Sequence, residues 1–132
     1  MGKDRKDISI DFIRTLENRQ SADELIPFYH PDIEQVEYPN SLVKSTALRN
    51  LDKLLEGAQK GKMVLQKEEY DIQKIYSFGN TVILEATWTG TLAIPLGNLP
   101  VGGKMKAHFA QFYEFKDDKI IRQRNYDCFE AF

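Results

Sequence analysis

The chain has 132 residues, 42% of them hydrophobic and 29% charged, with a formal net charge of -2. It therefore supports one domain with one core and has no general attraction for nucleic acid or an anionic membrane. A single cysteine excludes an internal disulfide, two histidines leave few ligands for a metal, and no apolar run is long enough for a transmembrane helix or placed as in a secretory signal. We expect one cytoplasmic domain over residues 1–132 that uses no cofactor or metal and binds neither nucleic acid nor membranes.

Two helices are predicted at the start of the chain. Apolar residues recur at helical spacing over roughly residues 6 to 19, which indicates an amphipathic helix capped near Asp4 or Asp7. The run Ser21-Ala22-Asp23-Glu24 has the spacing of a capping box and predicts a short second helix, which Pro31 is expected to end.

A short strand and a third helix are expected next. Ile33–Tyr38 is predicted to be the strand, and Ser45 or Thr46 is predicted to begin the helix. Gly57 and Gly61 lie near its expected end, where glycine commonly supplies a left-handed cap. Its expected inner face comprises Leu48, Leu51, Leu54, Leu55 and Ala58.

The pattern changes to that of strands after the third helix. Val64–Phe78 and Thr81–Ile94 are rich in β-branched and aromatic residues, with Gly79-Asn80 as the expected turn between them. One face of the second strand is predicted to carry Val82, Leu84, Ala86 and Trp88, and the other Thr81, Glu85, Thr87 and Thr89. A loop is expected over Pro95–Gly103.

The end of the chain predicts a long β-hairpin. Two aromatic-rich runs, Ala107–Phe115 and Ile120–Phe129, flank a polar turn. Polar side chains lie along these runs, namely His108, Gln111, Gln123, Asn125 and Asp127. They suggest a cavity with a polar lining. The order of elements predicts an α+β fold, with N-terminal helices packed on a strongly curved antiparallel sheet that encloses a pocket.

Four segments spread over the chain match the motifs of one superfamily. They are Phe28-Tyr29-His30-Pro31-Asp32-Ile33, Gly79-Asn80-Thr81-Val82, Glu114-Phe115-Lys116-Asp117-Asp118-Lys119-Ile120 and Arg124-Asn125-Tyr126-Asp127. With these segments the chain resembles the nuclear transport factor 2-like superfamily, in particular its SnoaL-like (polyketide cyclase) branch, although Asp118 stands where glycine is usual. The resemblance implies a single SnoaL-like domain, a cystatin-like cone with a deep pocket, usually in a homodimer. It does not imply one reaction, because this fold hosts isomerases, cyclases, dehydratases, epoxide hydrolases and non-catalytic binders.

The resemblance also points to the last strand for a general acid. In cyclase-like and epoxide-hydrolase-like members an aspartate near this point has that role, and the matching residue here is Asn125, which cannot exchange a proton. Asp127 lies two residues further along the strand, on the same predicted face. It would act as the general acid in place of the residue at position 125. A carboxyl in a largely apolar cavity should have a raised pKa, which suits acid–base chemistry near neutral pH. The alternative is a surface carboxylate paired with Lys or Arg.

The register of the hairpin decides which side chains of its first strand face the pocket. With a two-residue turn at Asp117-Asp118, His108 lies opposite Asp127 and the two form a candidate acid–base dyad. With a bulged three-residue turn the opposite set of side chains in the first strand faces the pocket, and the inward residues are Phe109, Gln111 and Tyr113. Comparison with the isomerase branch of the superfamily favours the second register.

The candidate site therefore has two proton-exchanging residues, Asp127 and His108, and a set of substrate-positioning residues. That set comprises Tyr38, Asn40, Trp88, Gln111, Tyr113, Gln123 and Asn125. Tyr38 and Asn40 have an alternative role as a turn after the first strand, and Trp88 as core or dimer packing.

Two functions remain open for such a cavity. The first is a cofactor-independent isomerase, cyclase or hydrolase that acts on a largely apolar small molecule by general acid–base catalysis. The second is a non-catalytic small-molecule binding or carrier protein. A homodimer is expected in both cases, because the outer sheet face carries Tyr126, Arg124 and Arg122.

Overall fold

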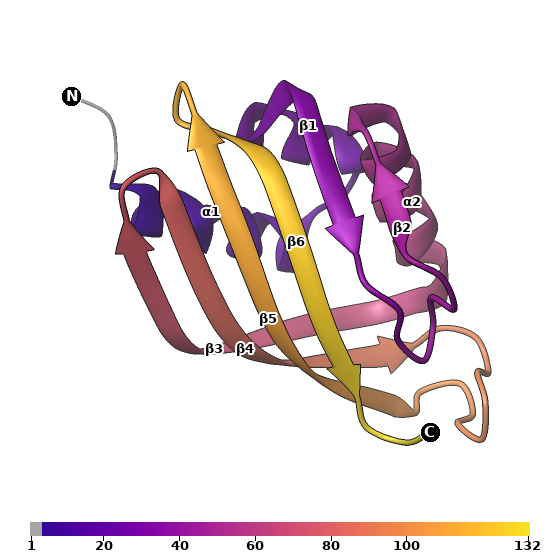
Figure 1. The fold of residues 1–132 in the computed structure, drawn as a ribbon. Helices are drawn as coiled ribbons and strands as arrows, with labels where there is room; N and C mark the ends of the chain where they lie inside the picture. The colour runs from indigo at the N-terminus through magenta and orange to yellow at the C-terminus, as the bar shows by residue number, and fades with distance from the viewer. Residues whose placement is uncertain (1–3) are drawn as a thin grey trace.

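The computed structural model describes residues 4–132, and over this range it has two α-helices, a 3-10 helix and six strands in one sheet. The elements in chain order are α1 (Arg5–Asn18), η1 (Ala22–Phe28), β1 (Tyr29–Glu37), β2 (Ala47–Arg49), α2 (Leu51–Val64), β3 (Leu65–Phe78), β4 (Thr81–Leu92), β5 (Lys104–Lys116) and β6 (Lys119–Phe129). The sheet has the order β2-β1-β6-β5-β4-β3, and it curves so that the helices lie behind its concave face in Figure 1. This is the predicted α+β cone. None of the helices within residues 4–132 is long and apolar enough to cross a membrane.

The first two helices begin where their caps predicted. The Asp4 side chain accepts a hydrogen bond from the Lys6 amide at 2.7 Å, and Ser21 forms the capping box of η1. The prediction that Pro31 ends the second helix is wrong, because η1 ends at Phe28 and Pro31 lies inside β1. Pro27 lies inside η1 and has no N–H to donate, which is consistent with a short segment that does not form an α-helix.

The predicted start of the third helix is also wrong. Residues 47–49 form β2, and α2 begins after Asn50, whose side chain accepts a hydrogen bond from the Lys53 amide at 3.0 Å. Ser, Thr and Asn are all favoured N-cap residues, so the sequence offered three starting points close together. Leu48 is 75% exposed in β2 rather than buried on a helix face. Gly57 and Gly61 lie within α2 and do not form a left-handed cap.

The strands from β3 to β6 form the predicted antiparallel meander. Gly79 has a φ of +58° in the first turn, and the inward residues of β4, Val82, Leu84, Ala86 and Trp88, are buried as expected. The sheet is not antiparallel throughout, because β1 pairs with β6 in parallel. A parallel pair requires a long connection, and α2 with the whole meander provides it here.

The turn and the register of the last hairpin combine the two predicted alternatives. Lys116 pairs with Lys119 across a two-residue turn, in which Asp117 and Asp118 have φ of 53° and 59°. Phe115 then pairs with Ile120, whereas Glu114 pairs with Arg122, so Ile121 is an extra residue in β6. The extra residue reverses which side chains of β6 face inward after the turn. Ile120 faces inward before the bulge, and the odd-numbered residues from Gln123 onward face inward after it.

The core lies between α1 and the concave face of the sheet. Phe12 and Ile13 are 1% and 0% exposed, and the Phe12 ring contacts the rings of Tyr29 at 5.4 Å and Tyr113 at 5.8 Å between centroids. These contacts fill the part of the cone nearest to α1.

The Asp117-Asp118 turn generates a prediction about stability. A residue other than glycine in the left-handed region costs roughly 1–2 kcal/mol, and glycine removes this cost at the price of greater freedom in the unfolded chain. We expect Asp118→Gly to raise the free energy of unfolding by about 0.5–1 kcal/mol in urea denaturation. The adjacent control Lys116→Gly, in extended backbone, should lower it by about the same amount. An equal decrease in the free energy of unfolding of both variants would contradict a strained turn.

Candidate functional site

Side chains on the concave face enclose two adjoining hollows of about 270 and 390 Å³. Both are lined by Glu37, Tyr70, Gln111 and Asn125, so they are two parts of one cavity. The smaller part reaches α1 and α2, and the larger part reaches the loop after β4. Together they have the size of a site for a small organic molecule.

A layer of buried amides forms the polar floor of the cavity. Gln111 lies opposite Asn125, and Gln123 lies opposite Gln35 of β1. The Tyr113 hydroxyl donates to Oε1 of Gln111 at 2.6 Å, and Nε2 of Gln123 donates to Oδ1 of Asn125 at 2.9 Å. Oε1 of Gln123 is buried and has no hydrogen-bond partner among the described residues. The predicted residues Gln111, Gln123 and Asn125 therefore lie together at the cavity.

Asp127 lies at the end of this layer, in the larger part of the cavity. Its Oδ1 is buried and has no hydrogen-bond partner among residues 4–132. Burial, and after it the negative charge of Glu37, raise the pKa of this carboxyl from 3.8 to about 7, although the hydrogen bond with Gln111 and the positive charge of Arg49 act in the opposite direction. Asp127 is thus a group that can take or give a proton near neutral pH.

Aromatic rings line the larger part beside Asp127, which pairs with Phe109 across the strands. Trp88 stacks on Phe109 with centroids 5.5 Å apart, and Phe129 packs edge-on against both. The indole nitrogen of Trp88 donates to Glu68 at 3.1 Å, and the other carboxylate oxygen of Glu68 accepts from the buried guanidinium of Arg19 at 2.8 Å. Trp88 is both buried core and cavity wall, and this chain of polar contacts fixes its ring.

Two further charged residues of the cavity were not among the predicted site residues. Glu37, the last residue of β1, pairs with Arg49 of β2 at 2.7 Å, and the same guanidinium nitrogen donates to Gln35 at 2.9 Å. Glu37 shares the inward face of the strand with Gln35 and the buried Ile33, and this alternation could have identified it. Arg49 was not predicted, because a helix beginning at Ser45 or Thr46 would have placed this residue in the helix rather than in a strand beside β1.

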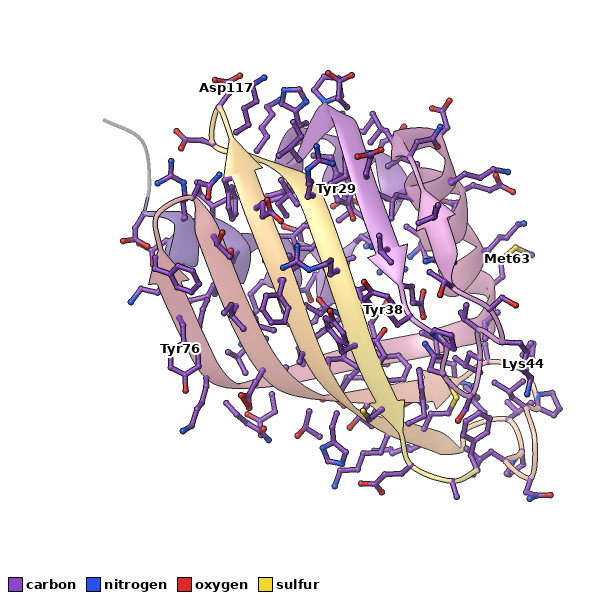
Figure 2. The ribbon with its side chains drawn as sticks, viewed as in Figure 1. Tyr29, Tyr38, Lys44, Met63, Tyr76 and Asp117 are labelled. Carbon is purple, nitrogen blue, oxygen red and sulfur yellow. The ribbon has the colours of Figure 1, made fainter. Side chains whose placement is uncertain are left out.

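Four predicted site residues do not line the cavity, namely Tyr38, Asn40, His108 and Tyr113, and the last of these is fully buried in the core. The Tyr38 ring, labelled in Figure 2, stacks at 4.8 Å on Tyr126, which is exposed on the outer face of β6. Asn40 forms a turn, with Oδ1 accepting from the amides of Leu42 and Val43, and its Nδ2 donates to Glu37 at 2.9 Å.

The predicted dyad of His108 and Asp127 does not form. His108 lies opposite Cys128, because the bulge at Ile121 reverses the parity after the turn. It is exposed on the outer face, where Nε2 is 2.9 Å from a carboxylate oxygen of Glu130.

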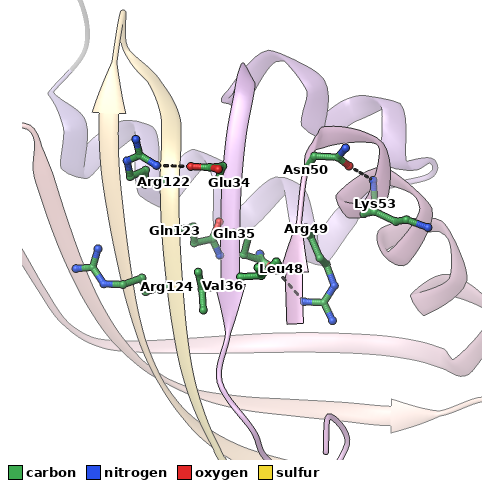
Figure 3. A pocket seen from close by; sticks show the side chains of 10 residues that line it. All are labelled: Glu34, Gln35, Val36, Leu48, Arg49, Asn50, Lys53, Arg122, Gln123 and Arg124. Carbon is green, nitrogen blue, oxygen red and sulfur yellow. Dashed lines mark hydrogen bonds and ion pairs between the residues drawn. The ribbon is translucent and has the colours of Figure 1, made fainter. Parts of the chain in front are cut away.

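A further hollow of about 450 Å³ lies between β1, β2, β6 and the start of α2, and it shares Gln35, Arg49 and Gln123 with the smaller part of the cavity. Figure 3 shows Arg122 directed toward Glu34 across the adjacent strands, with which it forms an ion pair. Arg124 pairs with Glu114 at 2.6 Å. The basic side chains of this hollow are thus engaged with acidic neighbours, and the proton-exchanging candidate Asp127 lies in the inner cavity instead.

Within residues 4–132, no group of three or more His, Cys, Asp or Glu side chains is placed to hold a metal ion.

Comparisons with known proteins identify the family and the fold. The family model described as SnoaL-like domain matches residues 10–123. None of the curated proteins matches the chain significantly. IdmH of Streptomyces antibioticus, a candidate polyketide cyclase, is 14% identical with a TM-score of 0.79, over 95% of this chain and 92% of that one.

Two other solved structures are similar at the same level. A phenazine biosynthesis-related protein of Pseudomonas aeruginosa is 19% identical with a TM-score of 0.74, over 96% of this chain and 79% of its own. A protein of Catenulispora acidiphila with a ketosteroid isomerase-like fold was solved in complex with trimethylamine. It is 14% identical with a TM-score of 0.71, over 90% of this chain and 83% of its own. At these identities the likeness concerns the fold.

The raised pKa of Asp127 predicts a pH-dependent stability. The folded state holds the proton more tightly than the unfolded state, so the free energy of unfolding should fall as pH rises from about 4 to about 7 and then level off. Asp127→Asn removes this loss. Its stability relative to the wild type should therefore increase by on the order of 2–4 kcal/mol between pH 4 and pH 8 in urea denaturation. The exposed control Asp71→Asn should show no such increase, and a flat difference for Asp127→Asn would contradict the buried carboxyl.

Proposed function

We propose that this chain, which belongs to the SnoaL-like domain family, binds a small, largely apolar organic molecule in the inner cavity and acts on it by general acid–base catalysis. In this proposal it works as a single cytoplasmic domain without a cofactor, as an isomerase, cyclase or hydrolase. The observation that carries the proposal is the Asp127 carboxyl in the cavity, with a buried oxygen that has no hydrogen-bond partner among the described residues and a pKa of about 7.

The surroundings of Asp127 support roles for its neighbours. Gln111 and Asn125 provide amide groups that can position a carbonyl or hydroxyl oxygen of the ligand. Trp88 and Phe109 provide an apolar wall for a ring or chain. A carboxyl that is half protonated near pH 7 can donate a proton to the ligand oxygen or accept one from it.

The comparisons fit a cavity of this kind. The likeness to IdmH, a candidate polyketide cyclase, supports cyclisation as one reaction of the proposed class. The trimethylamine complex of the Catenulispora acidiphila protein supports the binding of a small molecule by this fold.

A non-catalytic binding protein is the second candidate function. Asn125 favours it, because this amide stands where the superfamily motif has its acidic residue and cannot exchange a proton. Both functions predict ligand binding, and they differ in whether Asp127 is needed for a reaction.

A simple ketone tests the proposed function. The probe is 2-tetralone, and we expect the wild type to bind it, with quenching of the Trp88 fluorescence, and to accelerate exchange of its α-hydrogens with D₂O, measured by proton NMR. Asp127→Asn should bind with similar affinity but lose about a hundredfold or more of the exchange rate, because proton transfer by a positioned group contributes about 10²–10⁴ in rate. Binding without acceleration by the wild type would favour the carrier function. Full exchange activity in Asp127→Asn would remove Asp127 from the mechanism.

We also propose a homodimer that buries the outer face of β5 and β6. Phe112 and the half-exposed Tyr126 pack at 5.7 Å, and the Arg124 guanidinium lies 5.0 Å above the Phe112 ring. Rings and guanidinium groups of this kind are enriched at protein interfaces.

Sedimentation at micromolar concentration should then give about twice the 15.3 kDa mass of the chain. Tyr126→Glu places a charge in the proposed interface and should shift the protein toward the monomer. Tyr76, which is similarly exposed on the distant strand β3, provides the control Tyr76→Glu, which should remain dimeric. A wild type that sediments only as a monomer would overturn the dimer.

A further inference from the structure

We propose that the smaller part of the cavity is a binding site for an uncharged hydrogen-bond donor of the ligand, a hydroxyl or N–H group, which the side-chain oxygen of Gln123 accepts. The ligand class is then an elongated, mostly apolar ring compound that carries this donor at the end away from Asp127. The inference rests on the proposed binding of a ligand in the cavity, and it names the group by which that ligand is recognised.

The amide oxygen of Gln123 is an acceptor without a donor. Gln123 lines the smaller part and is 3% exposed, and its Oε1 has no hydrogen-bond partner among residues 4–132. Its Nε2 donates to Oδ1 of Asn125 at 2.9 Å, so turning the amide over would break this bond. Oε1 of Gln111 already accepts from the Tyr113 hydroxyl at 2.6 Å. A buried acceptor without a partner is costly, and a donor on the ligand would remove that cost.

The charges around Gln123 favour an uncharged donor. Among the described residues that line the smaller part, only Glu37 and Arg49 are charged, and they are paired at 2.7 Å. Arg49 also donates to Oε1 of Gln35 at 2.9 Å, and Asn40 donates to the second oxygen of Glu37 at 2.9 Å. A cationic group would therefore lose its hydration beside a guanidinium and gain no unpaired carboxylate.

Apolar side chains from the helices provide much of the remaining lining of the smaller part. They are Phe12 and Leu16 of α1, Leu25 of η1, and Leu54 and Ala58 of α2. An apolar wall that faces one free acceptor suits a ring with a single hydroxyl or N–H group.

Gln123 and Asp127 lie toward opposite ends of the cavity. Both face inward from β6, and their separation along the strand is about 13 Å at a rise of about 3.3 Å per residue. Of the two parts, Gln123 lines the smaller and Asp127 the larger, whereas Gln111 and Asn125 line both. An elongated ligand can therefore place its reacting group beside Asp127 and its donor at Gln123.

Two ketones that differ only at the far end test this inference. 6-Hydroxy-2-tetralone carries a donor there, and 6-methyl-2-tetralone carries a methyl group of similar size without one. We expect the wild type to bind the hydroxy compound about tenfold more tightly in isothermal titration calorimetry, because the methyl group leaves the Gln123 oxygen unpaired. Gln123→Met has a similar shape but no strong acceptor, so its two dissociation constants should be about equal.

Two further variants serve as controls. Gln73→Met removes an amide that donates to Thr87 at an exposed site and does not line the cavity, so this variant should keep the tenfold preference. Gln123→Glu retains acceptor oxygens at the same position and should also prefer the hydroxy compound. If Gln123→Met does not fold, Gln123→Asn withdraws the oxygen by one methylene group and should reduce the preference.

The outcomes separate this inference from the proposed function. Equal affinities of the wild type for the two ketones would overturn the inference, and so would an unchanged preference in Gln123→Met or Gln123→Asn. Both results would leave the proposed function in place if the wild type still accelerates the exchange of α-hydrogens. A preference that depends on Gln123, without exchange of either ketone, would support the inference and contradict the catalytic function.

Discussion

The bulge at Ile121 fixes the direction of every side chain in the second half of β6. Phe115 and Ile120, next to the hairpin turn, are 2% and 0% exposed and must face the core. With unbroken alternation from Ile120, Arg122 and Arg124 would point into the cone, where unpaired guanidinium groups are costly to bury. One extra residue allows the apolar pair at the turn and the polar residues further along to face inward together. The polar floor of the cavity and the position of Asp127 both depend on this bulge.

The cavity also depends on a contrast between paired and unpaired charges. Arg19 and Glu68 form a buried ion pair that links the helices to the cavity wall, since the Arg19 guanidinium also donates to the backbone carbonyls of Leu16 and Ala58. Removing one partner of such a pair is strongly destabilising, so these groups are suited to holding structure. Asp127 forms no ion pair within residues 4–132, and burial raises the pKa of its carboxyl although the charge of Arg49 acts in the opposite direction. Glu37 and Glu68 are each paired with an arginine, whereas Asp127 forms no ion pair among the described residues.

The sequence predicted the order of elements well, because periodicity and caps are local signals. The alternation of β4 and the capping box of Ser21 were confirmed on this basis. The start of α2 was not predictable, because several good N-cap residues lie close together and packing selects among them. The inward positions of Gln123, Asn125 and Asp127 were expected from alternation, whereas the position of His108 depended on a bulge that has no clear local signature. Glu37 and Arg49 come together only through the pairing of β1 with β2, a tertiary contact.

The parallel contact between β1 and β6 has a consequence for how the molecule folds. Tyr29 pairs with Ile120 and Glu37 pairs with Asn125, so strands from opposite ends of the chain meet in the middle of the sheet. Contacts of such long sequence separation form slowly, since a long loop must close before they contribute. On the ribosome β1 cannot find its partner until β6 has emerged, and until then β1 and β5 each present an open strand edge. The wall that carries Glu37 and Asp127 is therefore expected to be among the last parts to form, and nascent chains to be most prone to associate just before that point.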